Sequence, residues 1–179
     1  MRTAAVLALL LAACSSQPDH RAATAPPQTA GAVDLERYQG RWFEIMRYPN
    51  RFERDCHGVT ADYALRDDGG IDVVNTCRKG ALDGPEEVAK GVARRTGPAT
   101  LEVKFAPSWV PFAWGDYWVL ALEEDYSAAL VGSPDGKYLW VLARTPTPPG
   151  EAVARMTAAA EARGYDADAL ERTPQPPAR

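Results

Sequence analysis

The chain has few of the residues from which catalytic and metal sites are usually built. Its 179 residues include two histidines and three cysteines, and these do not follow the ligand spacing of a zinc site. No glycine-rich phosphate-binding loop is present. The formal net charge is −4 and the basic residues form no stripe, which argues against a nucleic-acid partner. We therefore expect no catalytic residue, no metal and no cofactor.

Apolar runs long enough to cross a bilayer as a helix are also missing. Residues 1–13 combine one positive charge, a short apolar run and a small-residue cleavage site, which is typical of a secretory signal peptide. Leu11-Ala12-Ala13-Cys14 resembles the lipobox of bacterial lipoproteins, in which the cysteine becomes the acylated N-terminus. The alternative is an ordinary signal peptide with an incidental cysteine. In such lipoproteins Ser15, rather than aspartate, implies sorting to the cell outer membrane.

The region after Cys14 is predicted to be a flexible tether. Residues 14–33 are rich in Ser, Gln, Ala, Thr and Pro and have almost no large apolar side chain. A coil of this length spans about 25 Å. The lipid-anchored protein would then float just off its membrane.

Residues 34–172 are predicted to form one all-β domain. Short strands at steady spacing, joined by hairpin-length turns, indicate an eight-stranded antiparallel up-and-down barrel, with a sandwich as the alternative. One helix, over 151–163, should pack outside the barrel, and the Pro-rich tail 173–179 should be frayed. The expected strands are 40–48, 59–66, 71–78, 87–95, 100–106, 116–123, 128–132 and 137–143.

Two cysteines remain once Cys14 is assigned to the lipid. In an exported protein Cys56 and Cys77 are a candidate disulfide, which would stabilise the fold by about 3 kcal/mol. Two free buried thiols are the alternative. Simple hairpin register pairs Cys77 with Thr60, so the first loop would have to fold inward for the bridge to close.

Three motifs in order give the chain a specific resemblance. Gly40-Arg41-Trp42 lies at the start of the first strand, Ser133-Pro134-Asp135-Gly136-Lys137-Tyr138 precedes the last, and Arg144 follows it. Together they resemble the signature of the lipocalin family, closest to its bacterial outer-membrane lipoproteins. The resemblance implies a calyx whose floor is plugged by Trp42, with Gly40 permitting a tight turn and Arg144 stacked on the indole.

The barrel topology then separates an open mouth from a closed floor. The loops 49–56, 80–86, 107–114 and 133–136 should lie at the mouth, and the turns near residues 68, 97 and 125 at the floor. Alternation along the strands predicts the cavity lining, although a one-residue slip would invert a strand. The predicted ligand-binding residues are Glu44, Met46, Tyr63, Val103, Phe105, Tyr117, Val119, Tyr138 and Trp140.

Two features of this prediction stay open. Glu44 could meet a ligand headgroup, donating a hydrogen bond if its pKa is raised, or could be a structural carboxylate held by Tyr or Arg. The aromatic residues Trp109, Phe112 and Trp114 in one mouth loop could form a portal, touch a bilayer, or fold down as a lid.

The resemblance implies a lipid-anchored protein that binds a fatty acid or lysophospholipid for storage or transport in the cell envelope. One alternative is a lipocalin-fold enzyme with Glu44 as general acid or base. Another is a periplasmic interaction lipoprotein whose barrel is filled by side chains such as Tyr117 and Trp140. The sequence leaves open whether the barrel forms a homodimer.

Overall fold

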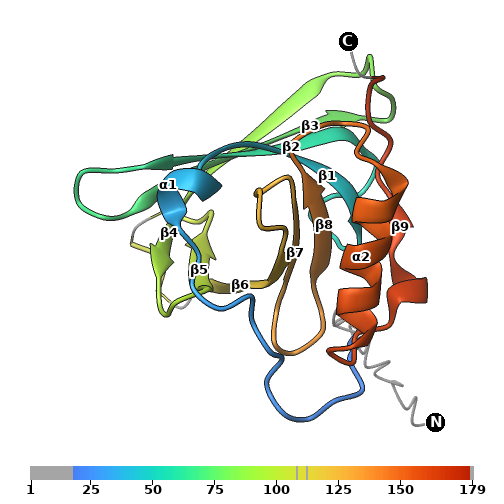
Figure 1. The fold of residues 1–179 in the computed structure, drawn as a ribbon. Coiled ribbons are helices and arrows are strands. Elements are labelled where there is room, and N and C mark those ends of the chain that lie inside the picture. Colours follow the sequence, from blue (N-terminus) through green and yellow to red (C-terminus); the bar gives the residue numbers. More distant parts are fainter. Residues whose placement is uncertain (1–17, 108, 112, 178–179) are drawn as a thin grey trace, which may run out of the picture.

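The computed structural model describes residues 18–107, 109–111 and 113–177, so the predicted signal peptide and Cys14 lie outside it. Eight antiparallel strands form a closed barrel, because β1 pairs with both β2 and β8. The helix α2 (Gly150–Glu161) packs outside, as predicted (Figure 1). The strands are β1 (Gly40–Arg47), β2 (Cys56–Leu65), β3 (Ile71–Lys79), β4 (Glu86–Arg95), β5 (Thr100–Lys104), β6 (Gly115–Leu122), β7 (Ala128–Gly132) and β8 (Leu139–Ala143).

Turn chemistry explains why successive strands pair as neighbours. In the turn between β2 and β3, Gly69 has a φ of 80°, which glycine adopts without steric cost. The Asp68 carboxylate accepts a hydrogen bond from Gly70 N at 2.9 Å. Leu65 and Ile71 are then directly paired, so the turn fixes the register of the hairpin as far as the pair Thr60 and Thr76.

Because the strands alternate in direction, the loops gather at two ends. The loops 48–55, 80–85, 105–114 and 133–138 lie at the end that we call the mouth, and the turns 66–70, 96–99 and 123–127 lie at the floor. The short helix α1 (Leu35–Tyr38) covers the floor (Figure 1). The predicted assignment of the two ends is therefore confirmed.

The floor is built around Trp42, which is fully buried. Its indole nitrogen donates to the Tyr38 carbonyl at 2.8 Å, and the Arg144 guanidinium lies over its ring at 3.9 Å. Arg144 also donates to the carbonyls of Arg37 (2.7 Å) and Arg41 (2.9 Å). The Arg144 guanidinium thus joins α1, β1 and the end of β8. Trp42 and Arg144 therefore have the structural role that the motifs predicted.

The disulfide between Cys56 and Cys77 is present, with a Cα–Cα distance of 5.4 Å. The expected obstacle does not arise, because β2 begins at Cys56 itself and the register shifts between His57 and Thr60. This irregularity brings Cys56 level with the end of β3. The bridge therefore forms between neighbouring strands, and the first loop does not need to fold inward.

Residues 18–33 differ from the expected flexible tether. This segment, which we call the N-terminal strap, runs along the outside of the barrel to α1 (blue in Figure 1). Its backbone donates from Ala22 to Gly164, from Ala30 to Val119 and from Val33 to Pro98 at 2.9–3.0 Å. Small and proline residues build no core of their own, but they let the strap lie close against the barrel.

Candidate ligand-binding site

The barrel encloses a cavity between its mouth and the tyrosines of its lower half. Its volume is about 540 Å³, including the space open to solvent. Apolar side chains line most of the wall, and a few polar groups interrupt it. The lining residues are Glu44, Glu53, Val59, Thr60, Ala61, Tyr63, Val73, Asn75, Val103, Phe105, Tyr117, Trp140 and Leu142.

Of the predicted lining residues, the structure brings six together in this wall: Glu44, Tyr63, Val103, Phe105, Tyr117 and Trp140. Val119 is fully buried in the interior core with Trp42 and does not line the cavity. Tyr138 stacks on Trp140, with ring centroids 5.7 Å apart, and lies at the mouth. Val119 and Tyr138 face the barrel interior, as their strand positions suggested. Val119 lies below the cavity, and Tyr138 lies above it.

The prediction for Met46 is wrong. The pairing of β1 with β8 shifts register between Glu44 and Met46, so the alternation of side chains slips by one residue. Met46 packs with Ile45 in the outer cluster against α2, and Arg47 takes the inward position. A strand pattern carries no signal for such a slip, and sequence reasoning therefore missed Arg47.

Three ionisable side chains form a largely buried polar group on the mouth side of the cavity: Glu44, Arg47 and Glu53. Arg47 Nε lies 3.4 Å from Glu44 Oε1 and 3.7 Å from Glu53 Oε2. Arg47 Nη2 donates to the Glu53 carbonyl oxygen at 2.8 Å, and Trp140 Nε1 donates to Glu53 Oε2 at 3.2 Å. Glu53 comes from the first loop, where no strand pattern indicates that its carboxylate points inward.

Burial has a direct consequence for Glu44, which is 3% exposed. Loss of hydration raises the pKa of its carboxyl well above the usual value, and the nearby Glu53 carboxylate raises it further. Hydrogen bonding from Thr173 Oγ1 and the charge of Arg47 act in the opposite direction without cancelling the shift. Burial therefore shifts the Glu44 carboxyl toward its protonated form, and in that form it can donate a hydrogen bond.

The C-terminal segment completes the wall beside this carboxyl. The paired region of β1 and β2 covers only four residues of β1, and nearer the mouth β1 pairs with β9 (Glu171–Arg172). Gln175 Nε2 then donates to the carbonyls of Glu44 (2.8 Å) and Val59 (2.9 Å), one on each strand. This tail, described as far as residue 177, is docked here and differs from the frayed end that the sequence suggested.

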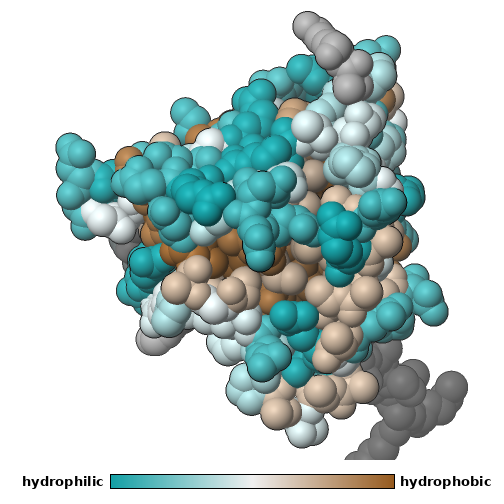
Figure 2. Space-filling model, viewed as in Figure 1, coloured by the Kyte–Doolittle hydropathy of each residue, from teal (hydrophilic) through white to brown (hydrophobic). Residues whose placement is uncertain are grey.

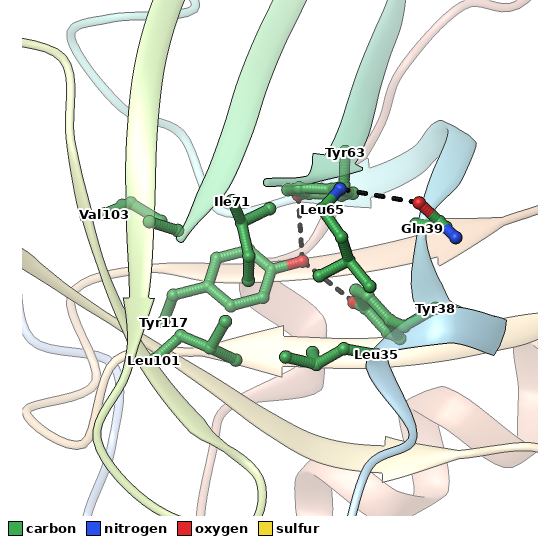
Figure 3. A pocket seen from close by; sticks show the side chains of 10 residues that line it. Leu35, Tyr38, Gln39, Tyr63, Leu65, Ile71, Leu101, Val103 and Tyr117 are labelled. Carbon is green, nitrogen blue, oxygen red and sulfur yellow. Dashed lines mark hydrogen bonds between the residues drawn. The ribbon is translucent and has the colours of Figure 1, made fainter. Parts of the chain in front are cut away.

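Below the cavity, three tyrosines form a chain of hydrogen bonds. Tyr117 bonds through its hydroxyl to Tyr38 (2.8 Å) and to Tyr63 (2.9 Å) (Figure 3). Burial raises the pKa of each of the three phenols, so all are neutral. Three hydroxyls carry three protons, and the two bonds use two of them. The chain is therefore a neutral polar layer across an apolar interior.

A second hollow, of about 300 Å³ including the space open to solvent, lies on the floor side of these tyrosines. Leu35, Leu65, Ile71 and Leu101 contribute to its apolar wall (Figure 3). Hydrophobic residues gather in a recess next to α1 on the molecular surface (Figure 2). Because Tyr63, Val103 and Tyr117 line both spaces, they form a partition between the cavity and this floor hollow.

Comparison with known proteins bears on this architecture. Residues 33–175 match the family model described as a lipocalin-like domain. The chain is 42% identical over 165 residues to the outer membrane lipoprotein Blc of Escherichia coli strain K12, covering 91% of this chain and 89% of the relative. The chain belongs to the lipocalin family. Temperature-induced lipocalin-1 of Arabidopsis thaliana is 38% identical over 148 residues, which are 80% of each chain.

Solved structures agree with this lipocalin on the fold. Insecticyanin from the tobacco hornworm Manduca sexta superposes with a TM-score of 0.66 at 18% identity, covering 87% of each chain. The major allergen Per a 4 from cockroaches also gives a TM-score of 0.66, at 16% identity, covering 88% of this chain and 97% of its own. At such identities the likeness shows the fold alone.

The bacterial relatives also identify where this lipocalin resides. The protein of Citrobacter freundii, 41% identical over 176 residues, likewise bears the name outer membrane lipoprotein Blc. The present lipocalin is a lipid-anchored protein of the outer membrane. Its family and its cavity are consistent with binding of a hydrophobic ligand.

Proposed function

We propose that this lipocalin binds a single-chain lipid, a fatty acid or a lysophospholipid, and stores or carries it in the cell envelope. Cys14 would be the acylated residue that anchors it. The observation that carries the proposal is the cavity itself, which has apolar walls and one buried polar group. Each methylene transferred from water to such a wall gains about 0.8 kcal/mol.

The polar group suits the head of such a lipid. Protonated Glu44 can donate to a carboxylate or phosphate oxygen, and Arg47 offers a positive charge beside it. Asn75 Oδ1 is buried at the cavity wall with no hydrogen-bond partner among the described residues. An unpaired buried acceptor is unfavourable, so a hydroxyl donor on the ligand would satisfy it.

We infer binding rather than turnover. A raised pKa would suit Glu44 as a general acid, and this favours the enzyme as the second candidate. However, Thr173 and Arg47 already engage the Glu44 carboxyl, which agrees with a fixed wall residue. In the enzyme, Glu44→Gln would abolish turnover of a lipophilic substrate. In the binding protein, the same variant should keep most of its affinity, because glutamine is also a donor.

Native mass spectrometry of the chain beginning at Ser15, purified without detergent, tests the proposal. We expect an added mass of a fatty acid or lysophospholipid that is lost on delipidation and restored by adding the lipid. Val103→Arg, which places a charge in the wall, should prevent the restoration. Ala158→Arg is the matched control, because Ala158 is exposed on α2, outside the barrel. A wild-type protein that takes up no lipid would contradict the proposal.

A further inference from the structure

The N-terminal strap begins at the mouth of the barrel. His20 N donates to the Gly136 carbonyl at 3.1 Å, and Arg21 Nη1 reaches the Pro134 carbonyl at 3.4 Å. Both acceptors lie in the mouth loop between β7 and β8. Arg21 also lies over the ring of Tyr165, 5.4 Å from its centroid. Several independent contacts therefore hold this end of the strap in place.

From there the strap runs to the opposite end, where Val33 N donates to the Pro98 carbonyl at 2.9 Å. The strap therefore runs from the mouth of the barrel to its floor. Cys14 precedes Pro18, the first described residue, by four positions. Four residues span at most about 14 Å when fully extended. A lipid on Cys14 would hence lie close to the mouth. The barrel could not move away from the membrane as far as the predicted flexible tether of 20 residues would allow.

The exposed large hydrophobic side chains give a second, independent observation. Among the described residues, all of them lie at the mouth end of the barrel: Phe52 in the first loop, Leu82 between β3 and β4, Val88 near the start of β4, and Phe105 and Trp109 after β5. We call these five the mouth rim. The floor presents no such side chain in the part of the chain that the structure describes.

Trp109 in the rim differs from a nearby ring that the protein covers itself. Trp109 is 80% exposed, whereas the Arg94 guanidinium lies over Trp114 at 4.2 Å. Phe52 is 64% exposed with the Arg51 guanidinium 4.7 Å from its ring centroid. Trp109 is therefore no lid over the core, while Phe112 lies outside the described residues. Exposed tryptophan is favoured at membrane–water interfaces.

We propose that the mouth rim docks on the same membrane that holds Cys14, so that a lipid passes between the bilayer and the cavity without crossing water. The inference rests on the proposed acylation of Cys14. The short connection from Cys14 to the strap favours the membrane over a second copy of the chain as the occupant. So do the exposed large hydrophobic side chains, which among the described residues lie only at the end where the strap begins.

Tryptophan quenching in vesicles tests this orientation. The full-length acylated protein is reconstituted into phosphatidylethanolamine and phosphatidylglycerol vesicles that contain brominated acyl chains. We expect quenching of wild-type fluorescence, and Trp109→Phe should remove most of the quenched fraction. Trp118→Phe is the control, because that ring is half-buried against the α2 cluster. A flexible 20-residue insertion between Gln17 and Pro18 should weaken the quenching, since it releases the mouth from the surface.

Other outcomes separate the two proposals. An acylated protein that stays on the vesicles without quenching of Trp109 would overturn the docking inference and leave the anchor intact. Rim-to-rim crosslinks between copies, with Trp109 shielded from bromine, would overturn it in favour of a dimer. A protein that does not sediment with vesicles at all would refute acylation of Cys14, and the docking inference with it.

Discussion

Replacing Glu44 by glutamine should change how stability depends on pH. The native carboxyl has a pKa well above 4.5, because it is buried beside Glu53. Between the unfolded and the native pKa, the folded state therefore binds more protons than the unfolded state. The free energy of unfolding must then fall as pH rises through this window, by up to about 1.4 kcal/mol per pH unit. Above the native pKa the contribution becomes constant.

Glutamine is neutral at every pH and has nearly the same shape. The Glu44→Gln variant should thus differ little from wild type below pH 4.5 and become increasingly more stable than wild type as pH rises from there toward the native pKa. Urea unfolding followed by tryptophan fluorescence measures this difference. Glu161→Gln is a suitable control, because Glu161 is exposed at the end of α2.

The contribution of Glu53 can be separated in the same assay. Glu53→Gln removes a negative charge that raises the Glu44 pKa, so the pH-dependent loss of stability should become smaller. A Glu44→Gln difference that is flat with pH would refute the reasoning. So would a wild type that gains stability over the variant as pH rises, since the native carboxyl would then be ionised.

Three further predictions concern the scaffold. Replacing both Cys56 and Cys77 by alanine should lower the free energy of unfolding by about 3 kcal/mol, since the bridge closes a loop with a sequence separation of 21; an unchanged urea midpoint would contradict this. Arg144→Met should cost about 2–4 kcal/mol in the same assay, because a cation–π contact and bonds to several carbonyls are lost, and wild-type stability would exclude the proposed floor. Tyr117→Phe should destabilise by about 1–3 kcal/mol while lipid affinity stays near wild type, whereas a large loss of affinity would mean that its hydroxyl binds the lipid.

Much of the fold follows from local chemistry that the sequence displays. Gly69 and its neighbouring acidic residues fix one hairpin, and the motif residues Gly40, Trp42 and Arg144 occupy the floor as the family resemblance implies. These predictions succeed because each depends on a few adjacent residues or on a contact that the family signature implies.

The missed features depend on irregularities and on distant contacts. Alternation alone predicts Met46 on the inside, because it cannot reveal the slip that turns Arg47 inward. Glu53 enters the cavity from a loop, where no periodic pattern exists. The strap and the docked tail have compositions typical of disorder, and they are held by backbone bonds to the barrel, such as Gly58 N to the Pro174 carbonyl at 2.7 Å.

Photocrosslinking tests the central claim, a lipid inside the barrel, most directly. A fatty acid with a diazirine near its chain end is bound to the delipidated protein, irradiated, and located by peptide mass spectrometry. We predict crosslinks to the cavity wall, at residues such as Val73, Val103 and Leu142. Crosslinks confined to the outer cluster, at Met46 or Met156, would place the lipid outside the barrel and contradict the account.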